Sequence, residues 1–112
     1  MTPFNALLIG AIGGAVMFVG SAVLWKLKID DPVGAVPVHG FTGIWGVLAV
    51  GIFDPSGNIA AQAIGITAIV GWTAITSTVL LGAIKAVVGL RVSGKVEDEG
   101  LDTHEHGGVA YA

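Results

Sequence analysis

The chain has 112 residues, of which 54% are hydrophobic and only 12% are charged, and its mean hydropathy is +0.85. A soluble domain usually carries about 25% charged residues, so this composition excludes an ordinary soluble domain and favours a membrane protein. The formal net charge of -3 comes from acidic residues near the C-terminus, and the absence of cysteine excludes disulfides and thiolate metal sites.

Three stretches without any charged residue indicate how the chain is organised: 1–25, 32–53 and 55–84. A helix needs about 20 apolar residues to cross a bilayer, and each stretch is long enough. We therefore predict an all-α membrane protein with transmembrane helices at about 4–25, 32–53 and 59–84, followed by a polar tail at 93–112. A signal peptide is not favoured at the start, because no basic residue precedes an apolar run that is too long for a signal core.

The basic residues predict the orientation of the helices. They lie between the first two stretches and after the third, at Lys26, Lys28, Lys85, Arg91 and Lys95, and are absent from 1–5 and 54–62. By the positive-inside rule, the N-terminus lies outside and the C-terminal tail lies in the cytoplasm. We expect an integral protein of a plasma or bacterial inner membrane.

The first predicted helix carries a motif for close helix packing. Gly10 and Gly14 have the GxxxG spacing that lets two helix backbones approach in lipid. Trp25 falls at the predicted cytoplasmic interface, where aromatic anchors gather.

The second predicted helix has a polar beginning. Asp31 fits an N-cap that accepts hydrogen bonds from free backbone amides, and Pro32 fits the first helical position, where its missing N–H has no cost. This structural reading explains Asp31 better than a place on an ion path does. Pro37 is expected to remove a further hydrogen bond inside the helix.

His39 is the most informative residue of the chain, because it is an ionisable group within a stretch that should span the membrane. It lies about 12 Å from Asp31 along an ideal helix, so we expect it near mid-membrane. The residues on its helical face are small or apolar, such as Ala35 and Val36, and only Thr42 offers a polar partner. Such surroundings favour the neutral imidazole.

Three interpretations of His39 remain open. It could be a structural histidine bonded to a neighbouring helix, a haem or metal ligand, or a pore-lining group that hydrogen-bonds a small permeant. The pore is favoured, because the chain has no second intramembrane histidine for haem. In the tail, His104 and His106 lack enough companion ligands for a metal site. We expect no metal, no cofactor, no catalytic triad, no enzyme activity and no nucleic-acid partner.

Two segments of the chain resemble the ammonium transporter family, with its Amt, Mep and Rhesus members. The segment that resembles the stretch carrying the second of that family's two pore histidines reads DDPVGAVPVHGFTGIWGVLAVGIF. The segment similar to the family's cytoplasmic tail reads VGLRVSGKVEDEGLDTHEHGGVAYA. The resemblance covers all 112 residues but only the last three of the eleven transmembrane helices in the family fold.

The resemblance implies roles for the residues singled out above. His39 aligns with the second of the twin histidines, Ala35 and Val36 fall where apolar side chains line the lower pore, and Asp31 matches a structural acidic residue at the cytoplasmic end of that helix. Thr42 is expected to be structural near the pore, because of its helical spacing from His39. The implied activity is passage of ammonium, and of methylammonium as an open possibility, with ammonia moving along an apolar channel between the histidines. A bare ammonium ion would lose far more solvation there than ammonia.

The resemblance also implies partners for the tail. In the family the tail packs beneath a homotrimer, and in many prokaryotes a P-II nitrogen-regulatory protein docks there. The matching residues are Gly100, Leu101, Asp102, His106, Gly107 and Tyr111. Gly108 departs from the family, which commonly has Glu after the HG pair.

The other pore histidine, the vestibule aromatics and the first eight helices of the family are missing from these residues. We therefore expect a piece of a longer protein, a truncated product, or a subunit completed by another chain, and no ammonium conduction by the 112 residues alone. The main alternative is a non-transporting membrane interaction module that assembles with or regulates complete transporters. A third hypothesis, an electron-transfer anchor, predicts a haem absorption band.

Overall fold

The computed structural model describes residues 1–110, which form helices joined by loops and contain no strand. The helices are α1 (Pro3–Lys26), η1 (Val36–Phe41), α2 (Thr42–Phe53), α3 (Ile59–Val87), α4 (Gly94–Glu99) and α5 (Leu101–His106). The chain divides into two compact units, Met1–Gly71 and Trp72–Ala112. The first unit holds α1, η1, α2 and the beginning of α3, and the second holds the rest of α3 with the tail helices.

Three helical segments are long and apolar enough to cross a membrane: Pro3–Lys26, Val36–Phe53 and Ile59–Val87. The prediction of three such helices is therefore confirmed by length and composition. The first starts one residue earlier and ends one residue later than expected, and the third extends three residues further, to Val87.

The second span begins later than predicted, at Val36 instead of Pro32. The backbone at Gly34 has a φ of 66°, a left-handed conformation that interrupts any helix running through it and that glycine adopts without strain. Asp31 is therefore not the N-cap residue, and Pro32 is not the first helical residue. Pro37, which we expected inside a helix, lies in its first turn, where a missing N–H costs little.

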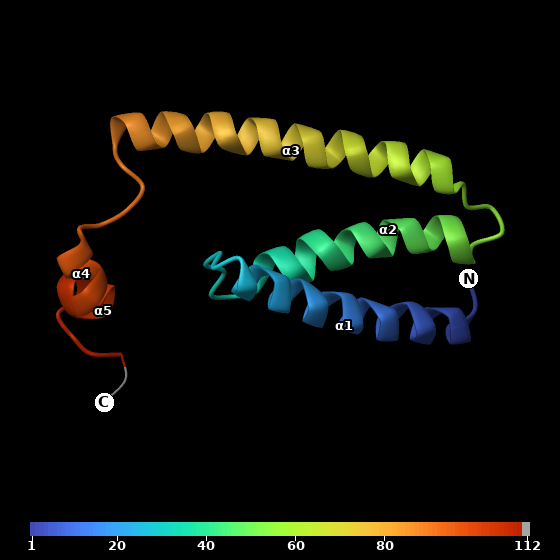
Figure 1. Ribbon diagram of the computed structural model, residues 1–112, viewed down its shortest axis with the longest axis horizontal. Coiled ribbons are helices and arrows are strands. Elements are labelled where there is room, and N and C mark those ends of the chain that lie inside the picture. Colours follow the sequence, from blue (N-terminus) through green and yellow to red (C-terminus); the bar gives the residue numbers. More distant parts are fainter. Residues whose placement is uncertain (111–112) are drawn as a thin grey trace. The chain divides into compact units, whose positions relative to one another are not determined.

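The helices α1 and η1–α2 pack side by side as an antiparallel pair (Figure 1). The close contacts lie at Gly13 and Gly20, which are buried and seven residues apart on one face of α1. An added Cβ atom at Gly20 would lie 2.5 Å from Cδ2 of Phe41, whereas Gly10 and Gly14 have open space. The expected GxxxG contact is thus not made within the described chain, and a different glycine pair packs the two helices.

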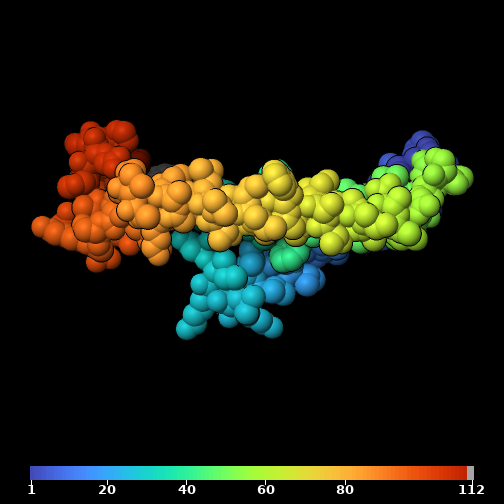
Figure 2. Space-filling view, turned by 90° about the horizontal axis from the view of Figure 1, so that it is seen from above, coloured from blue at the N-terminus to red at the C-terminus, as the bar shows by residue number. Residues whose placement is uncertain are grey.

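Very little of this chain is buried. The buried hydrophobic residues among those described are Leu24 and Ala49. No residue of α3 is buried, and its Trp72 is 72% exposed. Figure 2 shows the side chains of α3 standing out along its length, from green to orange. These helices are apolar on all sides, which is typical of segments covered by lipid or by other helices.

The polar tail contains two short helices, α4 and α5. The guanidinium group of Arg91 donates hydrogen bonds to the carboxylate of Glu97, and Lys95 Nζ lies 3.7 Å from Glu99 Oε1. Both pairs are exposed, so each contributes little to stability. The contacts described for the tail are therefore local and weak.

Candidate functional site

His39 lies in η1, a single wide turn of π-helix at the start of the second span. The backbone N–H of Thr42 donates to the carbonyl of Pro37, five residues earlier, instead of the four-residue partner of an α-helix. Wide turns of this kind occur mostly as local insertions in α-helices, and often at functional sites. His39 therefore lies where the helix is locally widened.

The carboxylate of Asp31 holds the N-terminal end of this turn. Asp31 Oδ1 accepts a hydrogen bond from the backbone N–H of Ala35 at 2.8 Å, and Oδ2 accepts one from Val36 at 2.9 Å. These two amides have no partner inside the helix, because it begins there. Asp31 therefore satisfies the helix start from a position further upstream than a standard N-cap. Its structural interpretation is supported by this geometry.

Thr42 holds the C-terminal end of the turn. Its hydroxyl donates to the carbonyl oxygen of Pro37 at 3.0 Å, and the carbonyl oxygen of Gly13 on α1 lies 3.4 Å away. The methyl group of Thr42 faces the same glycine, because a Cβ added at Gly13 would lie 3.3 Å from it. The side chain therefore lies against α1, and no hydrogen bond joins Thr42 to His39 among the described residues.

Two aromatic residues that sequence reasoning did not single out complete the contact with α1. Phe41 lies against Gly20, and the indole N–H of Trp45 donates to the carbonyl oxygen of Ile9 at 3.0 Å. The signal that could have found them is their spacing: aromatic residues four apart on one helix face glycines seven apart on the other. Pro37, also in η1, is fully buried.

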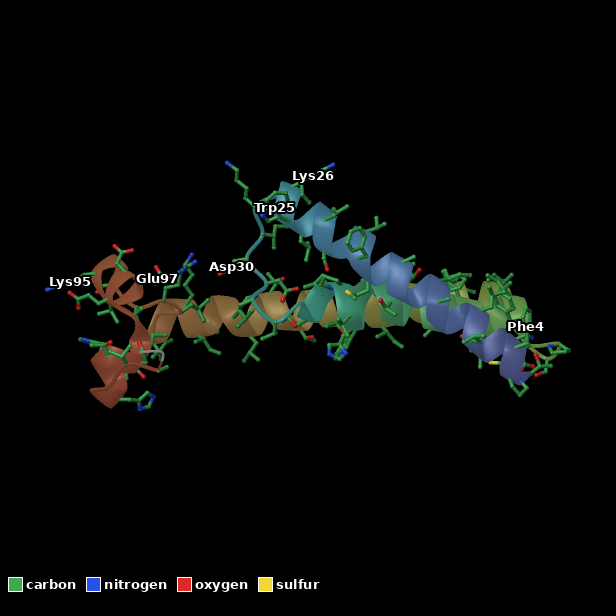
Figure 3. The ribbon with its side chains drawn as sticks, turned by 90° about the horizontal axis from the view of Figure 1, so that it is seen from below. Phe4, Trp25, Lys26, Asp30, Lys95 and Glu97 are labelled. Carbon is green, nitrogen blue, oxygen red and sulfur yellow. The ribbon has the colours of Figure 1, made fainter. Side chains whose placement is uncertain are left out.

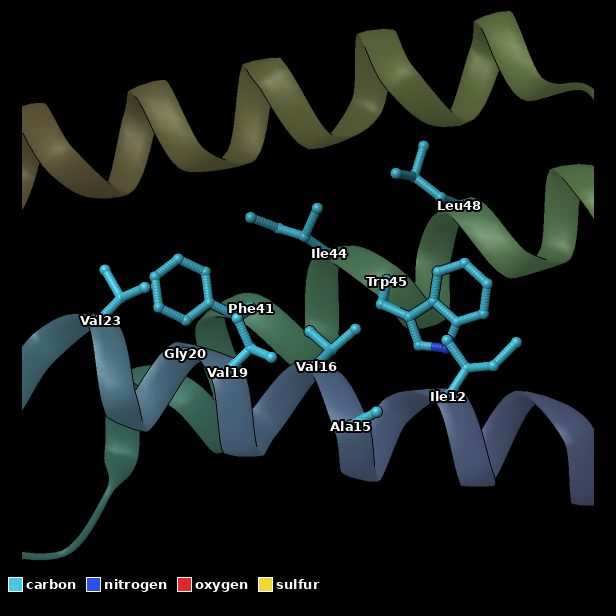
Figure 4. A pocket seen from close by; sticks show the side chains of 10 residues that line it. All are labelled: Ile12, Ala15, Val16, Val19, Gly20, Val23, Phe41, Ile44, Trp45 and Leu48. Carbon is cyan, nitrogen blue, oxygen red and sulfur yellow. The ribbon is translucent and has the colours of Figure 1, made fainter.

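An apolar groove of about 540 Å³ lies between α1 and η1–α2. Figure 4 shows the rings of Phe41 and Trp45 apart from each other along the groove, with Ile44 between them and Val23 of α1 beside Phe41. The lining has no charged residue and consists of Ile12, Ala15, Val16, Val19, Gly20, Val23, Phe41, Ile44, Trp45 and Leu48. His39 is not among the lining residues, so the groove and the histidine are separate features of the pair.

The side chains predicted to line a pore are exposed on this chain. His39, Ala35 and Val36 all lie on the surface of the first unit, and the imidazole makes no hydrogen bond within the described residues. The chain thus presents His39 outward while it fixes the backbone around it. An exposed imidazole with both nitrogen atoms available can donate and accept hydrogen bonds.

The ends of α1 carry the residues expected at a membrane interface. Trp25, which is 82% exposed, and Lys26 lie together at the C-terminal end, and Phe4 lies at the opposite end (Figure 3). An indole ring next to a lysine is typical of the level of the lipid headgroups.

The tail residues predicted to be regulatory form a small local structure around α5. Gly100 and Gly107 flank the helix with φ values of 90° and 67°, Leu101 and His106 are exposed, and Asp102 is half-buried. Tyr111 lies outside the residues that the structure describes.

Two carboxylates outside the predicted spans have a lowered pKa. Hydrogen bonds from the backbone amides of Ala110, at 2.7 Å, and Thr103, at 2.9 Å, lower the pKa of Asp102. The hydroxyl and then the backbone amide of Ser56 lower the pKa of Asp54 in the loop before α3. In both cases the donated hydrogen bonds stabilise the charged carboxylate. Among the described residues, no group of three His, Asp or Glu side chains lies close enough to hold a metal ion.

Three apolar helices, interfacial aromatic and basic residues, and a histidine within a span define a multispanning membrane protein. The sequence model of the Ammonium Transporter Family matches residues 1–111. The chain belongs to this family, whose members are transporters, and it is an integral membrane protein.

Relatives from distant organisms agree with this assignment. The chain is 37% identical to Ammonium transporter Amt2 of Archaeoglobus fulgidus, with 97% of the chain and 28% of the relative covered. It is 39% identical to Ammonium transporter Amt1 of Haloferax mediterranei, with 99% and 22% covered. It is 32% identical to Ammonium transporter 1 member 2 of Arabidopsis thaliana, with 98% and 26% covered.

The chain thus spans 22% to 28% of the length of these curated relatives. No solved structure is significantly similar to this one.

Proposed function

We propose that this chain supplies one pore-lining histidine, His39, to a transporter that moves ammonium or ammonia across a cell membrane. The observation that carries the proposal is the exposed imidazole on a fixed wide turn inside an apolar span, in a chain that belongs to the Ammonium Transporter Family. Ammonium is the substrate implied by the names of the relatives, and methylammonium is a related candidate.

The chemistry of the segment supports ammonia as the species beside His39. An ammonium ion is costly to strip of water, whereas ammonia loses little solvation in an apolar channel. A neutral imidazole can hydrogen-bond ammonia and can pass a proton. Ala35 and Val36, which are exposed and lie four and three residues before His39, are proposed to contribute apolar lining to the same channel.

The 112 residues are proposed to be inactive alone. They provide one intramembrane histidine, and the side chains beside it are exposed rather than enclosed. The proposed orientation puts α1 with its N-terminal end outside and Lys26, Lys28 and the tail in the cytoplasm. The whole transporter is proposed to be a homotrimer of eleven-helix subunits, and the tail around Asp102 is proposed as a contact for neighbouring subunits or a P-II regulator.

Replacing the matching region of a relative tests the proposal. A chimera of Archaeoglobus Amt2, with its matching part exchanged for this chain, is expected to restore methylammonium uptake to cells without ammonium transporters. The 112 residues expressed alone are expected to reach the membrane without restoring uptake. Uptake by the chain alone would contradict the inactive-fragment proposal, and a correctly inserted but inactive chimera would contradict the proposed function.

A second candidate function is a non-transporting module that binds complete transporters. The observation that favours it is the unburied apolar surface of α3, which calls for a covering partner or lipid. Co-expression with a complete relative separates the two functions. Dominant inhibition of uptake favours the module, and unchanged uptake at matched expression argues against it.

A further inference from the structure

The wide turn that carries His39 contains a side-chain hydrogen bond from Thr42 to Pro37 that has no role in the proposed function so far. The carbonyl of Pro37 accepts two hydrogen bonds, one from the backbone N–H and one from the hydroxyl of Thr42. Threonine hydroxyls inside helices usually bond to the carbonyl four residues earlier. For Thr42 that carbonyl belongs to Val38. The hydroxyl bonds instead to the carbonyl of Pro37, five residues earlier, as the backbone N–H of Thr42 does in this wide turn.

We propose that the Thr42 hydroxyl is a positioning group that locks the wide turn and thereby sets the direction of the His39 imidazole. This inference rests on the proposed role of His39 as the group that meets the substrate. Thr42 itself does not touch the substrate in this proposal, because its side chain lies against α1.

The size of the effect follows from helix geometry. If Thr42 bonded to Val38 instead, the turn would contain one residue fewer, and the residues before it would rotate about α2. One residue of an α-helix corresponds to about 100° of rotation, so His39 would leave the helix in a different direction. The register of this single turn therefore determines which surface of the pair presents the imidazole.

Contacts on α1 explain why the wide register is retained. The methyl group of Thr42 packs against Gly13, and the ring of Phe41 packs against Gly20. A Cβ added at Gly20 would lie 2.5 Å from the ring of Phe41, which would have to move, and a Cβ added at Gly13 would lie 3.3 Å from the methyl group of Thr42, which is a tight contact. A change of the hydrogen-bond register before Thr42 would move Phe41 away from Gly20. The contacts at Gly13 and Gly20 and the hydrogen bond of the Thr42 hydroxyl therefore all favour the wide turn.

Isotope-edited infrared spectroscopy tests the lock on the 112-residue chain in lipid bilayers. The Pro37 carbonyl, labelled with ¹³C and ¹⁸O, is expected to absorb at a lower frequency than a labelled Ala49 carbonyl inside the regular α2 helix, because it accepts a second hydrogen bond. This comparison needs no variant. Coincident bands would overturn the proposal.

Variants then connect the lock to His39. Thr42→Val is expected to raise the Pro37 frequency and to change severalfold the rate at which diethyl pyrocarbonate modifies His39, relative to His104 and His106 in the same chain. Thr42→Ser keeps the hydroxyl and is expected to restore both values. Thr76→Val is the matched control, because the Thr76 hydroxyl donates to the carbonyl of Trp72 at 2.8 Å within α3.

Both readouts have outcomes that decide the proposal. If Thr42→Val leaves the Pro37 band unchanged, the hydroxyl does not lock the turn. If the band shifts while the reactivity of His39 is unchanged, the positioning role is wrong. Neither readout requires transport, so this inference can fail while the chimera transports methylammonium, and it can hold while the chimera does not.

Discussion

At the scale of single residues, Asp31 shows how one carboxylate can begin a helix from outside it. Its two oxygen atoms accept hydrogen bonds from the backbone amides of Ala35 and Val36, where the second span begins. Capping interactions of this type contribute about 1 kcal/mol, with a range of about 0.5 to 2 kcal/mol. The loop before the helix is thereby joined to the turn that carries His39.

Replacing Asp31 by asparagine should loosen the start of the second span. Asparagine offers one acceptor oxygen where the carboxylate offers two, so we expect a loss of about 1 kcal/mol of local stability. Hydrogen–deuterium exchange at the amides of Ala35 and Val36 measures the effect, and both should exchange faster. Asp30→Asn is the matched control, and equal protection in the two variants would contradict the capping role.

Asp102 makes the tail sensitive to acid. Its pKa is lowered in the folded tail, so the stabilisation by its carboxylate is fully present above the unfolded value of 3.8 and is lost as the pH falls through the lower folded value. We therefore expect the amide of Ala110 to lose protection from exchange below a pH of about 3.8. NMR titration of the Asp102 carboxyl carbon and of that amide measures both events.

Asp102→Asn provides the control for this titration. It should show weak protection of Ala110 throughout and no step on acidification. A step that persists in this variant would assign the acid sensitivity to another carboxylate.

At the scale of helices, the packing of α1 against η1–α2 depends on Gly13 and Gly20, which have close contacts across the pair, whereas Gly14 has open space around it. Gly20→Ala should destabilise the pair, because the new methyl group must displace the ring of Phe41; overpacking of this kind costs about 1 to 3 kcal/mol. Gly14→Ala should be neutral or stabilising, because its surroundings are open and alanine favours helix.

The indole N–H resonance of Trp45 is a suitable measurement for both glycine variants, since that group donates to Ile9 across the helix pair. Gly20→Ala should shift or broaden the resonance, and Gly14→Ala should leave it in place. Equal spectra for the two variants would show that Gly20 is not a packing contact.

Sequence reasoning predicted the three spans well and the inner detail of the second span poorly. Long uncharged stretches identify helices because burying charge in lipid is costly, and this signal does not depend on tertiary contacts. The start of the second helix depends on the left-handed backbone of Gly34 and on amides that Asp31 reaches across a turn. These features depend on the folded backbone. A rule that assigns the N-cap from residue types along the sequence therefore placed the helix start too early, at Asp31 and Pro32.

The candidate site shows the same limit. The position of His39 in an apolar stretch singled it out from sequence, and its role in a pore stays a prediction. The contacts of Phe41 and Thr42 with α1 could not be predicted, because they require knowledge of which helices pack. The GxxxG rule selected Gly10 and Gly14 because it describes spacing within one helix. The contact actually made uses Gly13 and Gly20, which face Thr42, Trp45 and Phe41 on the other helix.

At the scale of the whole molecule, the chain exposes more apolar surface than one pair of helices can cover. The span Ile59–Val87 has no buried residue, so its surroundings must be lipid or further protein. We expect the 112 residues to remain in the membrane fraction after alkaline carbonate extraction. Release into the soluble fraction would contradict the assignment of three spans.

Uptake by the Archaeoglobus Amt2 chimera that carries this chain tests the role of His39 most directly. If the imidazole hydrogen-bonds the passing substrate, His39→Ala should lose about 1 kcal/mol, and methylammonium uptake should fall about fivefold at equal membrane level. His104→Ala, in the tail, should leave uptake unchanged. Equal uptake by the chimera and its His39→Ala variant would contradict a substrate-contacting role for His39.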